Sequence, residues 1–137
     1  ASGIGRACAV QLAAEGAIVF VTDIDAEGGR KTVELIEAAG DQATFRGQDV
    51  TEEPRWAELV KRVMDLYGRL DILVNNAGIG TSGLITEVTL EQWNRQMDIN
   101  VTSCFLGTKH ALPAMRSPRP DGHVGGSIIN ILSIYGR

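Results

Sequence analysis

The sequence predicts an α/β fold in which a parallel sheet carries helices on both faces. Short apolar runs and helical patterns alternate along the chain, and strands joined through helices are parallel with right-handed crossovers. Residues 72–74 form an uninterrupted apolar run, which is typical of a parallel strand that is covered on both faces. A length of 137 residues, with 44% hydrophobic and 22% charged residues, suits a soluble domain with a real core.

The predicted elements follow one another without an internal repeat or linker. We expect helices over residues 4–15, 26–39, 56–67 and 89–115, and strands over residues 18–23, 43–46, 71–74 and 127–132. Glycines end the first three helices. Residues 79–88 are predicted to be a loop, and the prolines and glycines of residues 117–125 indicate a surface loop.

Each predicted helix has a local signature. In the first, Ile4, Cys8 and Leu12 share one face, with Ala7 and Ala14 beside it. Thr51 is the expected N-cap of the third helix, whose apolar stripe consists of Trp56, Leu59, Val60, Val63, Met64 and Tyr67. Thr89 and Gln92 form the pattern of a capping box, and the last helix is expected to bend near Asn100.

A buried strand that runs directly into small and amide residues is the main pointer to a ligand. The strand over residues 71–74 is followed by Asn75, Asn76, Ala77 and Gly78. Ligands of open α/β sheets bind beyond the carboxyl ends of the strands, where small residues permit close approach and amides can bind or brace the loop.

Gly3, Gly5 and Asp23 together indicate a dinucleotide site. A glycine turn that enters a helix lets the backbone approach a pyrophosphate. Asp23 ends the next strand, near the spacing of about 20 residues at which such units place a ribose-binding acid. The alternatives are that the two glycines form an ordinary tight turn and that Asp23 is a solvated carboxylate at the end of a strand.

The same acid predicts NAD rather than NADP, because a carboxylate favours a free 2′-hydroxyl and repels a 2′-phosphate. Its expected neighbours Ser2 and Ile24 are neutral. Arg6 is close in sequence but lies inside the start of the helix, where it need not face the ribose.

Five motifs in order resemble the short-chain dehydrogenase/reductase family. They are Ser2-Gly3-Ile4-Gly5, Asp49-Val50, Asn75-Asn76-Ala77-Gly78, Asp98-Ile99-Asn100-Val101 and Ser127-Ile128-Ile129-Asn130-Ile131-Leu132-Ser133. The resemblance covers the whole chain and implies a Rossmann-type doubly wound parallel sheet. It is strongest to members that oxidise secondary alcohols with NAD.

The resemblance also implies roles for individual residues. Asp49 resembles the acid that binds the adenine, with Val50 beside the ring, and the segment from Asn75 to Gly78 resembles the one that supports the sheet and lines the cofactor site. The complete set of expected cofactor-binding residues is Ser2, Gly3, Ile4, Gly5, Asp23, Ile24, Asp49, Val50, Asn76, Ala77 and Gly78.

The catalytic residues implied by the resemblance are Ser133 and Asn100. Ser133 resembles the serine that hydrogen-bonds the substrate oxygen, and Asn100 the residue whose backbone carbonyl holds a water of the proton relay. Ser133, Ile134 and Tyr135 are expected to touch the substrate. The family's Tyr and Lys, spaced as Y-x-x-x-K, are not found in residues 1–137, and Tyr135 is too close to Ser133 to be that base.

Each of these residues has a structural alternative. Asn100 could sit at an ordinary helix bend, Ser133 could satisfy the backbone at a strand end, and Asp49 could simply lead into the Thr51 cap. Asp71 is interpreted as structural, Lys109 and His110 as helix residues without a catalytic role, and His123 as solvated. We expect no metal site.

Composition limits the partners. A net charge of −4 without a basic stripe argues against nucleic acid and anionic membranes, and no apolar run is long enough to span a membrane. Cys8 and Cys104 lie far apart, which favours a reducing cytoplasm. The resemblance implies a homodimer or homotetramer through the helices of residues 89–115.

We expect the chain to be part of a longer single-domain enzyme, because it opens inside the glycine turn and closes just after a strand. The predicted function is hydride transfer between NAD(H) and a secondary alcohol or ketone. The alternatives are an epimerase or dehydratase of an extended relative, and a dinucleotide-binding sensor or scaffold without the catalytic base.

Overall fold

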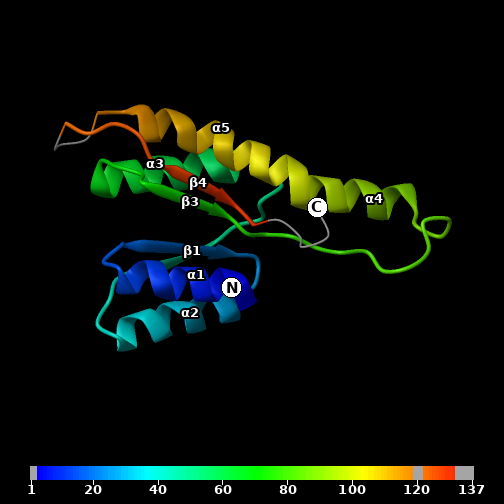
Figure 1. Cartoon of the computed structure of the whole chain (residues 1–137), viewed down its shortest axis with the longest axis horizontal. Coiled ribbons are helices and arrows are strands. Elements are labelled where there is room, and N and C mark those ends of the chain that lie inside the picture. The colour runs from blue at the N-terminus through cyan, green and yellow to red at the C-terminus, as the bar shows by residue number, and fades with distance from the viewer. Residues whose placement is uncertain (1–2, 119–121, 132–137) are drawn as a thin grey trace. The chain divides into compact units, whose positions relative to one another are not determined.

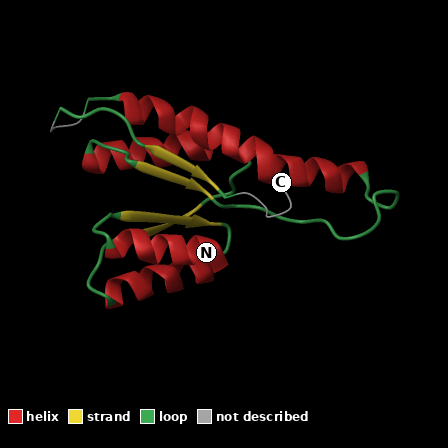
Figure 2. Ribbon diagram, viewed as in Figure 1, coloured by secondary structure: helices red, strands yellow, loops and turns green. Residues whose placement is uncertain are grey.

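The computed structural model describes residues 3–118 and 122–131. Helices and strands alternate as predicted (Figures 1 and 2). In chain order the elements are α1 (Gly3–Ala14), β1 (Val19–Asp23), α2 (Ala26–Ala38), β2 (Ala43–Gly47), α3 (Glu53–Tyr67), β3 (Ile72–Asn75), α4 (Leu90–Met97), η1 (Asp98–Thr102), α5 (Ser103–Arg116) and β4 (Ser127–Asn130). Ser2, Leu132, Ser133, Ile134 and Tyr135 lie outside the described residues.

The chain forms two compact units, residues 1–49 and residues 50–137. In the first, β1 and β2 pair in parallel, with Val19 opposite Ala43 and Asp23 opposite Gly47. Both helices of this unit lie on one face of the strand pair (Figure 1). Its core is formed by Ala9, Ala13, Val21 and Ile36.

The second unit repeats the parallel pairing. Here β3 pairs with β4, with Ile72 opposite Ser127 and Asn75 opposite Asn130. Helix α5 packs against β3 and α3. The buried side chains of this unit include Trp56 and Val63 of α3 and Leu106, Ala111, Ala114 and Met115 of α5.

The structure refines the predictions for two helices. The buried residues of α1 are Ala9 and Ala13, whereas Ile4 is 61% exposed, because α1 approaches its neighbours through small side chains. The N-cap of α3 is Glu52 rather than Thr51 and makes no side-chain cap bond. A proline in the first turn favours this start, since its fixed φ suits a helix and it lacks an N–H that would need a partner.

Asn75 is itself part of β3, so the strand extends one residue further than expected. The predicted stripe of α3 is buried at Trp56 and Val63 but reaches the surface at Tyr67, which is 38% exposed.

The predicted capping box is confirmed. Thr89 accepts a hydrogen bond from the Gln92 N–H at 3.2 Å, and the Gln92 side chain accepts one from the Thr89 N–H at 2.9 Å. The expected bend near Asn100 takes the form of a π-helical turn, η1, between α4 and α5. Single π turns inside helices occur frequently at functional sites.

Candidate functional site

The expected phosphate-binding turn is the beginning of α1. Gly3 has φ +52°, a conformation that L side chains rarely adopt, and a Cβ built there would meet no atom within 4 Å. Ile4 is largely exposed at the same end. The start of a twelve-residue helix therefore presents N–H groups that have no acceptor within the helix, beside an open glycine backbone, and both features suit an anion.

Asp23 is the last residue of β1, and Figure 1 shows the arrowhead of β1 at the same end of the unit as the start of α1. The Asp23 carboxylate accepts a hydrogen bond from the Asp25 N–H at 2.9 Å, and its backbone carbonyl accepts one from the Gln48 N–H at 3.1 Å. Ile24 is 74% exposed. The glycine turn and the acid thus share the carboxyl edge of this strand pair.

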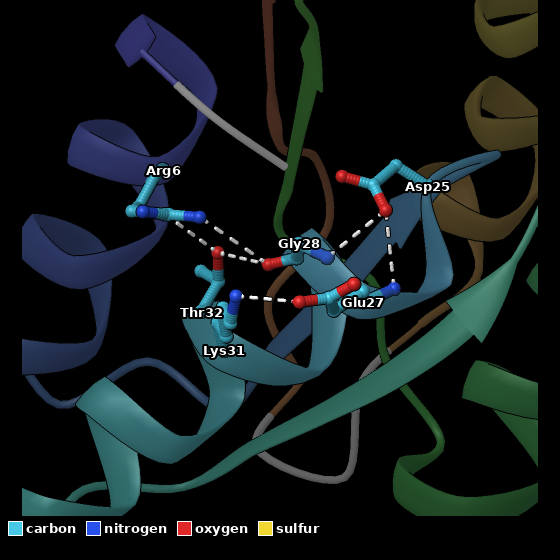
Figure 3. A network of polar contacts seen from close by, with 6 residues as sticks. All are labelled: Arg6, Asp25, Glu27, Gly28, Lys31 and Thr32. Atoms are coloured by element: carbon cyan, nitrogen blue, oxygen red, sulfur yellow. Dashed lines mark hydrogen bonds and ion pairs between the residues drawn. The ribbon is translucent and has the colours of Figure 1, made fainter.

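Sequence reasoning missed a polar network that joins α1 to α2 (Figure 3). Arg6 donates from Nε to Thr32 Oγ1 at 3.0 Å and from Nη2 to the Gly28 carbonyl at 3.5 Å. Thr32 is fully buried, and its hydroxyl donates to the same carbonyl at 3.0 Å. The only signal in the sequence was the presence of Arg6 and Thr32, which lie far apart in the chain and do not form a recognisable motif.

Hydrogen bonds in the first turn of α2 connect this network to the end of β1. Asp25 is the N-cap and accepts from the N–H groups of Glu27 and Gly28, each at 3.1 Å. The hydrogen bond from Gly28 is the main reason why the pKa of Asp25 is lowered, because it stabilises the charged carboxylate. Lys31 pairs with Glu27 at 2.6 Å on the exposed side of the same turn.

Asp49 and Val50 follow β2. Asp49 is exposed, and the Val50 carbonyl accepts a hydrogen bond from Trp56 Nε1 at 2.8 Å. Gln48, directly before them, is 5% exposed, and its side-chain amide has no hydrogen-bond partner among the described residues. Asp49 closes the first unit and Val50 opens the second.

In the second unit, two asparagines join the ends of β3 and β4. The buried Asn75 donates from Nδ2 to Asn130 Oδ1 at 2.9 Å, and its carbonyl accepts from the Ile131 N–H at 2.9 Å. Asn76, Ala77 and Gly78 follow at the carboxyl end of the strand, and Ala77 and Gly78 are exposed. Asn75 therefore braces the strands, Asn76 is half-buried, and Ala77 and Gly78 lie at the surface.

Asn100 holds the loop that leaves β3. Its Oδ1 accepts from the Ile79 N–H at 2.9 Å, and its Nδ2 donates to the Ile79 carbonyl at 2.8 Å. The carbonyl of Asn100 accepts a weak hydrogen bond from the Cys104 thiol at 3.5 Å. Two residues further along the loop, the N–H and hydroxyl of Thr81 donate to Gln96 Oε1 at 2.9 and 2.6 Å. Residues of α4 and η1 thus fix the segment after Gly78.

Lys109 and His110 form contacts between two helices. Both reach Glu53, at 2.6 Å and 3.0 Å, and so tie α5 to the start of α3. Asp71 is likewise structural: both of its carboxylate oxygens accept from Arg69, at 2.8 and 2.9 Å, and its carbonyl accepts from the Ser127 N–H.

Within residues 3–118 and 122–131, no group of three or more His, Cys, Asp and Glu side chains is placed to hold a metal ion. No helix in the same ranges is long and apolar enough to cross a membrane.

Comparison with known proteins identifies a family match over the entire chain. The model of the family described as short chain dehydrogenase matches residues 1–137. The trans-4-hydroxycyclohexanecarboxylate dehydrogenase of Sinomonas cyclohexanicum is 41% identical over 142 residues, covering 99% of this chain and 52% of the relative. The cyclopentanol dehydrogenase of Comamonas sp. is 40% identical over 136 residues, covering 99% of this chain and 52% of the relative. The chain spans about half the length of the curated relatives it matches.

The fold agrees with a solved structure of the same kind. A metagenomic short-chain oxidoreductase in complex with NADP superposes with a TM-score of 0.87 at 33% identity, covering 97% of this chain and 58% of that one. The predicted Rossmann-type α/β fold is thereby confirmed for this part of such a protein.

Proposed function

The chain belongs to the short-chain dehydrogenase family, whose members are oxidoreductases that use nicotinamide dinucleotides, and we propose that it acts in hydride transfer between NAD(H) and a secondary alcohol or ketone. The family match over residues 1–137 carries the proposal. Two relatives named for dehydrogenation of cyclic alcohols support the substrate class. In this proposal residues 1–137 are the NAD-binding part of a single-domain enzyme.

The proposed cofactor site fits the residues present. Ser2, Gly3, Ile4 and Gly5 would receive the pyrophosphate at the start of α1, where the open Gly3 backbone supports this role. Asp23, followed by Ile24, would accept hydrogen bonds from the adenosine ribose. Asp49 and Val50 would contact the adenine, and Asn76, Ala77 and Gly78 would line the site beyond β3.

NAD is the proposed cofactor, with NADP less favoured. A carboxylate at the end of β1 disfavours a 2′-phosphate. The Arg6 guanidinium, the nearby cation in sequence, is bonded to Thr32 and to the Gly28 carbonyl, which supports NAD further. The relative solved with NADP indicates that cofactor choice has to be measured for this protein.

The bound nicotinamide would supply the hydride chemistry, and the protein residues would position the substrate and move the proton. We assign to Ser133 the hydrogen bond to the substrate oxygen, with Ile134 and Tyr135 as its neighbours at the substrate. A Tyr/Lys pair outside residues 1–137 would be the base, since a nearby cation lowers the pKa of a tyrosine. Asn100 would hold a relay water through its backbone carbonyl. The two hydrogen bonds between its side chain and Ile79 would keep the π-helical turn η1 in position.

The partners follow from the same proposal. They are a small-molecule alcohol or ketone and further copies of the chain, in a homodimer or homotetramer through the helices of residues 89–115. Exposed apolar side chains on these helices support such an interface: Leu90, Trp93, Met97, Val101, Phe105 and Leu112. Nucleic acid and membranes are not expected as partners, and a cytoplasmic location is proposed.

The decisive experiment measures cofactor use in the full-length protein. Purified protein is assayed with NAD and NADP against a panel of secondary alcohols that includes cyclopentanol. We expect oxidation with a higher kcat/KM for NAD. Asp23→Ala should lower the NAD:NADP ratio of kcat/KM by about tenfold or more, in keeping with the loss of charge-assisted hydrogen bonds worth roughly 1.5–3 kcal/mol.

Glu34→Ala, which removes an exposed acid of α2, is the matched control and should leave the ratio unchanged. An unaltered ratio in Asp23→Ala would remove Asp23 from the cofactor site. Binding of NAD without turnover of any alcohol would favour the sensor, and turnover of a sugar nucleotide would favour the epimerase.

A further inference from the structure

One continuous path of hydrogen bonds connects the helix of the glycine turn with the acid at the end of β1. It begins at Arg6 in α1, reaches the Gly28 carbonyl and Thr32 in α2, continues from the Gly28 N–H to the Asp25 carboxylate, and ends with the Asp25 N–H on Asp23 Oδ1. Figure 3 shows Gly28 between Arg6 and Asp25, so this one residue links the bonds from α1 to the cap of α2.

Thr32 occupies the central position of this path. Its hydroxyl is fully buried, donates to the Gly28 carbonyl at 3.0 Å and accepts from Arg6 Nε at 3.0 Å. A hydroxyl in this position uses donor and acceptor together, which valine cannot do. Without it, the half-buried guanidinium would lose its 3.0 Å hydrogen bond to Thr32, while its 3.5 Å bond to the Gly28 carbonyl would remain.

The first turn of α2 restricts the orientation of the Asp23 carboxylate while this path of hydrogen bonds is intact. Asp25 caps the helix with two hydrogen bonds, and its own N–H holds one carboxylate oxygen of Asp23 at 2.9 Å. The orientation of the Asp23 carboxylate is therefore coupled to the position of the first turn of α2, and through Gly28 to Arg6 and Thr32.

We propose that Thr32 and Arg6 are positioning residues for cofactor selection, which orient Asp23 through the first turn of α2. This inference rests on the proposed function, because it assigns to Asp23 the discrimination between NAD and NADP. It adds residues that would not touch the cofactor. The two Arg6 bonds also hold the guanidinium on Thr32 and the Gly28 carbonyl, which preserves the preference of an acidic site for a free 2′-hydroxyl.

The test uses the full-length protein and the substitution Thr32→Val, which retains the shape of the side chain and removes the hydroxyl. We expect the KM for NAD to rise about three- to tenfold, the effect typical of one lost hydrogen bond, while kcat stays within about twofold. The NAD:NADP ratio of kcat/KM should fall by a similar factor. Thr32→Ser, which restores the hydroxyl, should recover most of the wild-type values.

Thr44→Val, on half-buried β2 of the same unit and outside this path, is the matched control and should change neither quantity. A purely structural role of Thr32 would lower the active fraction and thermal stability without changing KM or the cofactor ratio. That result, or a failure of Thr32→Ser to recover the KM, would overturn the proposal.

A double-mutant cycle tests whether the effect passes through Asp23. In the Asp23→Ala background, Thr32→Val should raise the KM for NAD less than twofold further. Fully additive effects would show that Thr32 acts by another route and would overturn this inference alone. A wild-type protein that binds neither dinucleotide, by calorimetry as well as by assay, would overturn the proposed function together with it.

Discussion

At the scale of single residues, asparagine amides organise the second unit. Asn100 binds both the N–H and the carbonyl of one residue, Ile79, and Asn75 uses its amide to reach Asn130 on the neighbouring strand. An amide can do both because it carries an N–H donor and a carbonyl acceptor side by side, which a carboxylate does not. Both motifs were recognised in the sequence, but their partners became apparent only in the fold.

Gly107 provides a test of how tightly Asn75 is enclosed. A Cβ on Gly107 would lie 2.6 Å from Asn75 Oδ1 and 2.9 Å from Trp56 Cη2, so alanine cannot enter without displacing one of them. Gly107→Ala should destabilise the full-length protein by about 1–3 kcal/mol through overpacking. Urea unfolding followed by circular dichroism measures this directly.

Gly80→Ala is the matched control for this prediction. Its Cβ would meet no atom within 4 Å and its φ is not positive, so the substitution should be neutral or slightly stabilising. Equal unfolding midpoints for the two variants would show that the space around Gly107 adapts without cost.

At the scale of elements, charged residues connect the start of α3 with α5. The hydrogen bond from Lys109, followed by that with His110, holds the pKa of Glu53 below its ordinary value of 4.5. Because the pKa is lower in the folded state, the contribution to stability is complete above the unfolded-state pKa and is lost as the pH falls through the folded-state pKa.

Glu53→Gln should therefore be less stable than the wild type at pH 7, and the difference should shrink as the pH falls below 4.5 and through the lowered folded-state pKa. Unfolding midpoints in urea at pH 7, 5, 4 and 3 give the comparison. Glu58→Gln, which affects an exposed acid paired with Arg55 within α3, serves as the control for a change that does not join two helices. A difference that is constant over this pH range would contradict the role of the Glu53 charge.

The boundaries of the helices show which features can be predicted from residues that are close in sequence. The capping box at Thr89 was predicted correctly because all of its partners lie within one turn. The bend near Asn100 follows from the sequence, but its form as a π-helical turn and the bond of Asn100 to Ile79 are apparent only in the structure. The buried side of α1 is formed by Ala9 and Ala13, which belong to the core of this unit, while Ile4 is exposed.

At the scale of the whole molecule, the strands within the described ranges form two separate parallel pairs, β1–β2 and β3–β4. Pairs of strands are marginal by themselves, and unpaired edges invite association. Apolar side chains of both units are exposed, among them Ile18 at 44%, Ile72 at 37% and Ile129 at 43%.

Residues 1–137 expressed alone are accordingly expected to be unstable, aggregated and inactive. Size-exclusion chromatography and thermal unfolding with and without NAD, beside the full-length protein, measure this. A monodisperse sample with a cooperative transition that NAD raises would contradict the expectation.

The sequence by itself determined the order of helices and strands and the strand ends at which candidate ligand-binding residues gather, because these follow from periodicity, glycines and caps within short stretches. The resemblance to the family came from five motifs in their order along the chain. The tertiary structure decided which residues from distant parts of the chain contact one another. Arg6 reaches Thr32, Asn75 reaches Asn130 and Glu53 reaches His110 across long separations in the chain. Such contacts leave no local pattern, since they depend on how close folding brings two distant segments.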